Sequence, residues 1–213
     1  FSPIPRRHVP RRSLPMEPMQ TEERRLTVER NVPVDALYMA FHMCSRNHPD
    51  YYAFDMLSDL LSSGRSSRFV QHLVQDKQIF NSIDAYISGS IDNGLFHIVG
   101  KPAPEKTLEE AEKAIWEELA LLTEGSIDEN ELEKVKNRYE SEQIFNNLNY
   151  LNVATNLAYF ELIGKAEDIN TEVKKYRSVT QEQIKRAAKQ TFLPENCSVL
   201  YYKAAAKGAS HTP

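Results

Sequence analysis

A run of leucines that stops at a glycine, followed by a second amphipathic segment, stands out in the first third of this chain. Apolar residues recur at helical spacing across Phe54–Leu61, and Gly64 has the character of a helix stop. Arg68–Gln78 then continues as a second helix with Phe69 and Leu73 on its apolar face. Two short helices in immediate succession cannot form a simple alternation of single strands and single helices.

Strand patterns lie on both sides of this helix pair. Polar and apolar residues alternate before it, which predicts strands at about 25–30 and 36–44. Two more strand-like stretches follow at 79–90 and 94–101. Asp92-Asn93-Gly94 separates them and predicts a short hairpin turn, so we expect this pair to be antiparallel.

The remaining sequence is mostly helical. Thr107 with Glu110, and later Thr180 with Gln183, have the spacing of capping boxes, which begin helices. The expected elements are a helix over 108–124 closed by Gly125, a long helical region from Ser126 or Asp128 to about Ile163 with a break near Asn146–Tyr150, a helix ending at Gln190, and a last strand over Cys197–Tyr202.

This order groups the helices between pairs of strands. Such grouping predicts an α+β fold, with a mostly antiparallel sheet and helices packed on one face. With 213 residues, of which 41% are hydrophobic, the chain is long enough for one domain with a substantial core. No apolar run approaches the roughly 18 residues that a membrane-spanning helix requires, so no membrane span is predicted.

Composition excludes several other classes of function. The net charge of -4 and the interleaving of basic with acidic residues provide no positive field for nucleic acid. Cys44 and Cys197 are too few for a disulfide framework, and each lies in a strand-like run, which predicts buried free thiols. The six histidines include no pair at i, i+4 spacing and are read as ordinary surface or core residues.

The first 23 residues differ from the rest of the chain. They hold five of the eleven prolines, which cannot donate backbone hydrogen bonds, and predict an extended linker or arm. The pairs Arg6-Arg7 and Arg11-Arg12 are read as part of a solvated connector and not as a recognition tail. The chain opens at Phe1 without a methionine, so we expect a C-terminal fragment or a processed half. Residues 24–213 are expected to form a single domain.

The stretch Leu57–Asn81, LSDLLSSGRSSRFVQHLVQDKQIFN, resembles the non-metal half of pitrilysin-type zinc proteases, the insulinase-like or processing-peptidase-like inverzincins. The active halves of that family carry H-x-x-E-H on a helix, with two histidine zinc ligands and a glutamate base. This chain has no such motif. If the two halves arose by duplication, Asp55, Ser58 and Asp59 stand where ligand, base and second ligand would be, and we expect them on a solvent-facing helix surface.

The same family has a second signature in its non-metal half, of the form L-R-E-K-R-G-L-A-Y. Its arginine and tyrosine are thought to hold the substrate and stabilise the oxyanion. Aligned on Leu73, this chain has Val74 in place of the arginine and Asn81 in place of the tyrosine. The segment GRSSR at Gly64–Arg68 could suggest an anion site, but Ser66 or Ser67 as a helix N-cap explains it without a ligand.

The resemblance therefore implies a catalytically silent C-terminal domain, with no catalytic, cofactor-binding or metal-ligating residue of its own. Such a domain would form a wall of a peptide-degrading chamber. Its expected partners are a zinc-binding N-terminal half, a homologous subunit carrying the Arg/Tyr pair, and a peptide substrate. Zinc is expected only in the full-length protein. The alternative is a non-catalytic structural or assembly subunit with the same fold.

Overall fold

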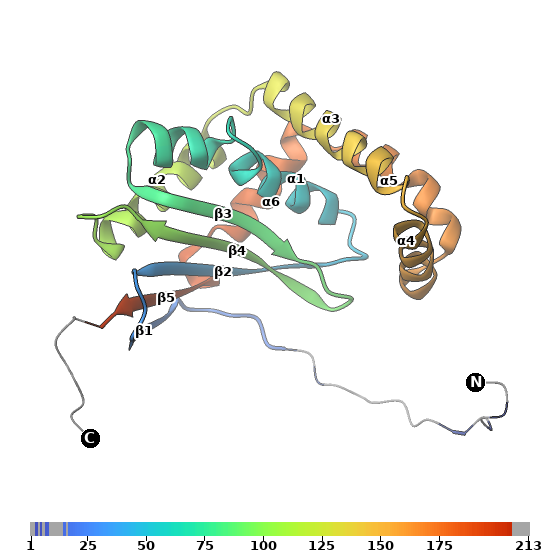
Figure 1. Ribbon diagram of the computed structural model, residues 1–213, viewed down its shortest axis with the longest axis horizontal. Helices are drawn as coiled ribbons and strands as arrows, with labels where there is room; N and C mark the ends of the chain where they lie inside the picture. The colour runs from blue at the N-terminus through green and yellow to red at the C-terminus, as the bar shows by residue number, and fades with distance from the viewer. Residues whose placement is uncertain (1–2, 4, 6, 9–14, 16, 206–213) are drawn as a thin grey trace.

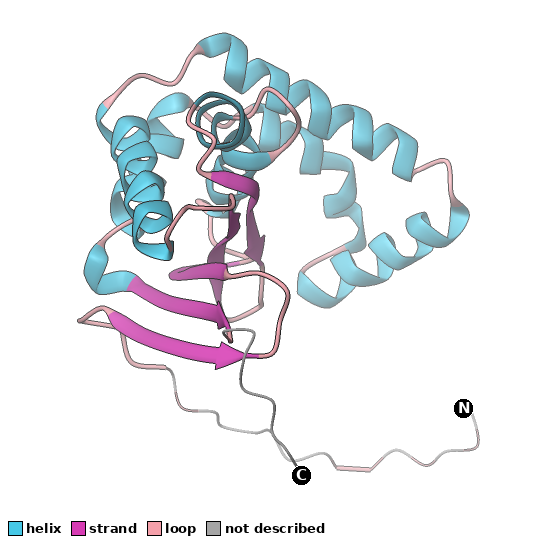
Figure 2. Ribbon diagram, turned by 60° about the vertical axis from the view of Figure 1, so that its left-hand side comes forward, coloured by secondary structure: helices cyan, strands magenta, loops and turns pink. Residues whose placement is uncertain are grey.

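The computed structural model describes residues 3, 5, 7–8, 15 and 17–205. One twisted sheet runs through the molecule, and the helices gather beyond one of its faces (Figures 1 and 2). The α+β fold expected from the sequence is confirmed. Eleven of the 23 residues of the Pro-rich arm, among them Arg6, Arg11 and Arg12, lie outside the described residues.

The sheet has five strands in the order β1-β5-β2-β4-β3. All neighbouring pairs are antiparallel except β1 with β5, which run parallel. This one parallel pair arises because β5 comes from the far end of the chain and inserts between β1 and β2. The strands are β1 (Arg24–Arg30), β2 (Ala36–Ser45), β3 (Phe80–Ser88), β4 (Asn93–Pro102) and β5 (Cys197–Ala204).

Helices supply the second layer. Four of them, α1, η1, α2 and α6, contact the strands directly, and α3 and α5 pack outside α1. Among the helices of the described residues, none is both long and apolar enough to cross a bilayer. The helices are α1 (Tyr51–Ser62), η1 (Phe69–Asp76), α2 (Leu108–Glu124), α3 (Glu129–Asn146), α4 (Tyr150–Ile163), α5 (Ile169–Arg177) and α6 (Gln181–Thr191), with short 3-10 turns η2 (Ala166–Asp168) and η3 (Pro194–Asn196).

The core lies between the sheet and the helices. Alternate residues of β2 face it, and Leu37, Met39 and Phe41 are almost completely buried. The rings of Phe41 and Phe96 both meet Phe192 edge-on, at centroid distances of 5.2 and 5.1 Å. Because successive strand residues point to opposite faces, this pattern confirms that helices cover a single face of the sheet.

Several local predictions hold and others need correction. Both capping boxes are present, and Asp128 is the cap of α3. The second helix of the opening pair, η1, is a π-helix, closed by the Lys77 amide donating to the His72 carbonyl. A segment of eight residues spans too few turns for apolar spacing to distinguish the two helix types.

Two further expectations were wrong in detail. The β3–β4 hairpin is antiparallel, but its connection is 89–92, and Asn93 and Gly94 already belong to β4. Ser67 is not a helix N-cap. Its buried hydroxyl donates to the Gly64 carbonyl at 2.7 Å, and η1 has no side-chain cap. Gly64 itself has φ of +88°, a backbone region that glycine enters without strain.

Candidate functional site: a polar cluster over helix α1

Asp55, Ser58 and Asp59 do not form the solvent-facing surface expected from the sequence. Ser58 is only 5% exposed, and both aspartates are partly buried. The covering elements are α3 and α5, which pack across this side of α1. The Ser58 hydroxyl donates to the Asp55 carbonyl oxygen at 2.8 Å. Periodicity within α1 could not reveal this cover, because both covering helices begin 70 or more residues downstream of Asp59.

The Asp55 carboxylate accepts a hydrogen bond from a tyrosine. Tyr176 on α5 donates its hydroxyl proton to Asp55 Oδ2, and the Tyr139 ring from α3 stacks on Tyr176 at an interplanar angle of 23°. Burial raises the pKa of the Asp55 carboxyl, while the hydrogen bond from Tyr176 acts in the opposite direction. This carboxylate is therefore already engaged within the fold.

One turn further along α1, Asp59 has a similar environment. Burial, followed by the nearby Asp55 charge, raises its pKa to about 6, and a hydrogen bond with Ser63 partly opposes the shift. The two neighbouring carboxyl groups on α1 therefore both have raised pKa values. Arg138 of α3 is the cation that lowers the pKa of Asp59.

A buried ion pair lies beside these carboxyl groups. Arg46, at the end of β2, places Nη2 2.5 Å from Glu172 Oε1, and both side chains are 8% exposed. Tyr52 donates its hydroxyl to Glu172 Oε2 at 3.1 Å, and the Arg46 guanidinium lies 4.4 Å from the Tyr51 ring centroid. Glu172 therefore accepts hydrogen bonds from Arg46 and Tyr52, and the rings of Tyr51 and Tyr52 lie beside the guanidinium. These contacts offset the cost of burying the ion pair.

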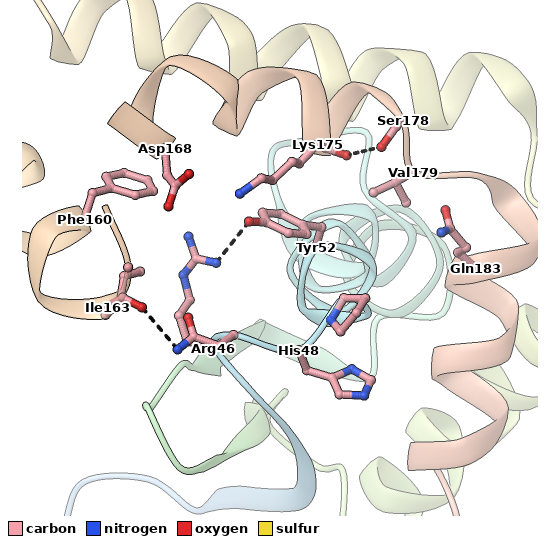
Figure 3. Close-up of a pocket in the computed structure, with 13 residues that line it drawn as sticks. Arg46, His48, Tyr52, Phe160, Ile163, Asp168, Lys175, Ser178, Val179 and Gln183 are labelled. Carbon is pink, nitrogen blue, oxygen red and sulfur yellow. Dashed lines mark hydrogen bonds between the residues drawn. The ribbon is translucent and has the colours of Figure 1, made fainter. Parts of the chain in front are cut away.

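The ion pair borders a surface hollow of about 400 Å³ (Figure 3). Tyr52 and Lys175 lie on one side of the hollow, and Phe160 and Ile163 of α4 lie on the other. The Asn47 amide donates to the Ile163 carbonyl oxygen at 3.4 Å and ties the β2–α1 turn to the end of α4. This mixed polar and apolar lining has no nucleophile paired with a base.

The cluster does not fit a zinc ion. Zinc sites of the expected type use neutral imidazoles, and α1 presents two aspartates and a serine in their place. Over the described ranges, no three His, Cys, Asp or Glu side chains come together in a group that could hold a metal. The chemistry available here is structural, namely hydrogen bonding and ion pairing between α1, α3 and α5.

Val74 and Asn81, the positions aligned with the family's arginine and tyrosine, lie at a second site. Both line a polar hollow of about 560 Å³ where η1 passes into β3, together with Lys77. Gln78 and Glu105 line the same hollow with positive φ angles of 50° and 74°. The structure therefore brings the two aligned positions to the same hollow. Neither Val74 nor Asn81 can supply the guanidinium or the phenol of the family's signature.

Comparison with known proteins decides the family. The model of the peptidase M16 inactive domain matches residues 1–139. This chain belongs to that family. The resemblance to the non-metal half of a zinc protease is confirmed, and the M16 inactive domain accounts for a helix α1 that lacks the zinc-binding motif.

Curated relatives of this M16 inactive domain are zinc proteases. The uncharacterized zinc protease YmxG of Bacillus subtilis is 25% identical over 83% of this chain and 43% of its own length. The zinc protease PqqE of Helicobacter pylori is 23% identical over 88% of this chain and 42% of its own length. The chain thus spans less than half the length of either relative.

Solved structures share the fold. A protease from Helicobacter pylori superposes with a TM-score of 0.83 at 22% identity, covering 92% of this chain and 48% of that one. An inactive peptidase domain from Bordetella parapertussis has a TM-score of 0.75 at 17% identity, covering 87% of this chain and 99% of that one. An M16 inactive domain from Pseudomonas fluorescens also has a TM-score of 0.75, at 15% identity over 91% of this chain and 45% of that one.

The residues that organise the site of this M16 inactive domain were missed in the sequence. Helix α5, which carries Glu172 and Tyr176, was not predicted at all. Ile169, Val173 and Tyr176 have helical i, i+4, i+7 spacing and could have revealed the helix. The partners of Glu172 and Tyr176 could not be found this way, because they lie 120 or more residues away in the chain.

Within residues 17–205, the histidines have separate contact partners. His72 Nδ1 lies 2.9 Å from Glu118 Oε1, and the His97 ring stacks on Tyr86. Burial lowers the pKa of His97. Both cysteines are free, as expected, but only Cys197 is fully buried, and Cys44 is partly exposed. The prediction of two buried thiols is therefore correct for one of them.

Proposed function

We propose that this chain is the non-catalytic half of a zinc-dependent peptidase, and that it supports a zinc-bearing H-x-x-E-H half outside this sequence. The observation that carries the proposal is the Tyr176–Asp55 hydrogen bond. It closes the position on α1 where a first zinc ligand would stand in an active half. Membership in the M16 inactive family and the zinc protease relatives support the same assignment.

Zinc belongs, in this proposal, to the remainder of the polypeptide. The two curated relatives extend well beyond the 43% and 42% of their lengths that this chain covers. The described residues here offer no metal-binding group, so no catalytic step is assigned to them. The chain acts as one wall of a chamber that holds a peptide, with residues 1–23 as the connector and 24–213 as one domain.

A homologous subunit with the Arg/Tyr pair completes the proposed enzyme. Val74 and Asn81 line one hollow and provide neither group, so oxyanion stabilisation has to come from elsewhere. The same observation favours the second candidate, a structural or assembly subunit with no proteolytic role. Loss of both active elements is common to the two candidates, and zinc in the full protein separates them.

The decisive experiment uses the complete encoded protein. Its zinc content is measured by mass spectrometry. Hydrolysis of a quenched fluorescent peptide library is measured for the protein alone and for its mixture with any neighbouring homologue that has the Arg/Tyr pattern. The proposed function predicts stoichiometric zinc, and activity that needs the mixture. A variant with the motif glutamate changed to glutamine should keep zinc and lose activity. No zinc and no hydrolysis in any combination would assign the chain to the structural class.

A further inference from the structure

Helix α4 has an unusual composition for a helix on the outside of a domain. Its sequence, YLNVATNLAYFELI, contains one charged residue, Glu161, within fourteen. Surface helices normally carry charged residues on the side that faces water. Apolar side chains occur all round α4, and a helix of that kind is stable in water only when it is covered on more than one side.

One side of α4 is covered within this chain. Phe160 is buried, and Val153 and Ile163 are partly buried on the same side. The main neighbours on this side are η2 and α5. The Asn47 amide bond to the Ile163 carbonyl oxygen adds an anchor at the end of the helix. These contacts fix how α4 is held and therefore which side remains open.

The other side, which we name the α4 outer face, consists of Leu151, Ala154, Ala158 and Leu162. All four are exposed, and their spacing of three, four and four residues places them in one stripe. Two leucines at the ends with two alanines between them form a shallow apolar surface. Nothing in the described part of the chain covers it.

The stripe continues around the corner between α3 and α4. Four large apolar side chains there are between 60% and 91% exposed, namely Ile144, Phe145, Leu148 and Tyr150. Figure 2 shows α3 and α4 meeting as a projecting corner away from the sheet. Large apolar side chains that are exposed together on one part of a domain indicate an interaction site.

We propose that the α4 outer face and the α3–α4 corner dock into an apolar groove of the zinc-bearing half of the same polypeptide. This inference rests on the proposed function. In both curated relatives, more than half of the length lies outside the share that this chain matches, at 43% and 42%. A tethered half reaches a high effective concentration, so a single helix and its corner suffice as a contact.

Shape and charge disfavour the other occupants. A projecting convex corner needs a concave partner, whereas a two-fold dimer would bring the corner against itself. Helices that lie on membranes are rich in Lys and Arg. From Tyr139 to Gly164 the chain has neither, and it contains the three glutamates Glu140, Glu142 and Glu161. An uncharged groove on another folded segment fits this surface best.

The test places single cysteines in the complete encoded protein. Leu151→Cys and Leu162→Cys report on the outer face. Lys113→Cys on α2 is the matched control, because that side chain is 79% exposed and lies in a charged surface. Each variant reacts with a maleimide at pH 7, and intact mass gives the rate after subtraction of the rate of the unsubstituted complete protein, whose thiols include Cys44 and Cys197 of this chain.

Docking predicts that positions 151 and 162 react at least about tenfold more slowly than position 113, at every protein concentration, because covered sites react only through local opening. Equal rates at the three positions would overturn the inference. Protection that disappears on dilution would identify a second copy as the occupant. Protection that requires vesicles of phosphatidylcholine and phosphatidylserine would identify a lipid surface. Either of these two results also overturns it.

The zinc content of the same samples keeps this inference separate from the proposed function. If zinc is present and the labelling rates are equal, the proposed function is supported and the docking proposal is contradicted. If the cysteines are protected and zinc is absent, the docking proposal is supported and the proposed function is contradicted. Because both substituted leucines are exposed in this chain, the variants do not depend on changes in its core.

Discussion

The hydroxyl of Tyr176 donates a hydrogen bond to the Asp55 carboxylate across 121 residues of sequence. The contact joins α5 to α1 at the position that our alignment of the two halves pairs with the first zinc ligand of an active half. The contact thereby makes this aspartate part of the packing between α1 and α5. The same cover brings Tyr139 onto Tyr176 and sets the environment of Asp59.

Replacing Tyr176 with phenylalanine should destabilise the domain by about 1 to 3 kcal/mol, because a buried carboxyl group loses its donor while the ring volume is kept. Urea unfolding followed by circular dichroism measures the change. Tyr86→Phe is the matched control, since Tyr86 is 48% exposed, lies outside the proposed docking surface, and should change stability very little. Equal effects of the two substitutions would show that the Asp55 bond contributes nothing.

Asp59→Asn should remove part of the pH dependence of stability. The pKa of Asp59 is about 6 in the folded protein, above the value near 3.9 expected when unfolded. Between these values the folded state binds more protons, so stability falls as pH rises from about 4 to 6. The variant should have a flatter profile and exceed the parent above pH 6 by on the order of 1 to 2 kcal/mol.

Thermal unfolding at a series of pH values checks this expectation. Asp84→Asn serves as the control, because Asp84 is exposed on β3. Asp55 keeps its own contribution in the Asp59 variant, with the same sign, so a residual slope remains. A variant whose profile stays parallel to that of the parent between pH 4 and 6 would rule out Asp59 as the titrating group.

The Arg46–Glu172 pair should behave as a coupled unit. Arg46→Leu removes the closer cation of Glu172 and leaves only the partly exposed Lys175, whose Nζ lies 3.8 Å from Glu172 Oε2. We therefore expect a loss near the lower end of the about 3 to 5 kcal/mol that is typical of a broken buried pair. Arg46→Leu combined with Glu172→Leu should recover most of that loss. The pair Arg186 and Asp50, whose side chains are 52% and 21% exposed, provides the comparison, and Arg186→Leu should change stability by less than about 1 kcal/mol. Additive effects of the two core substitutions in a double-mutant cycle would contradict coupling.

Both native thiols should react slowly while the domain is folded. Burial raises the pKa of Cys44 to about 11 and that of Cys197 to about 12, so little thiolate is present at pH 8. Iodoacetamide should modify both only when urea unfolds the protein. Lys113→Cys, with its exposed position, gives the rate of an accessible thiol. Rapid modification of Cys197 in the native state would contradict its burial.

Local sequence signals located most elements of the fold. The capping boxes at Thr107 and Thr180 begin α2 and α6 where the pattern placed them, because a cap depends only on residues within one turn. Helix α5 escaped notice, since its nine residues provide only three apolar positions. The parallel pairing of β1 with β5 joins opposite ends of the chain, and no local pattern encodes it.

The site shows the same division. Sequence alone determined which chemistry is missing, because the absence of H-x-x-E-H and the presence of Val74 and Asn81 can be read without any structure. Tertiary structure alone decided that the face of α1 with Asp55 and Ser58 is covered, through contacts with residues more than 70 positions away. Helical periodicity reports the faces of one helix, whereas burial depends on which distant helices pack against it.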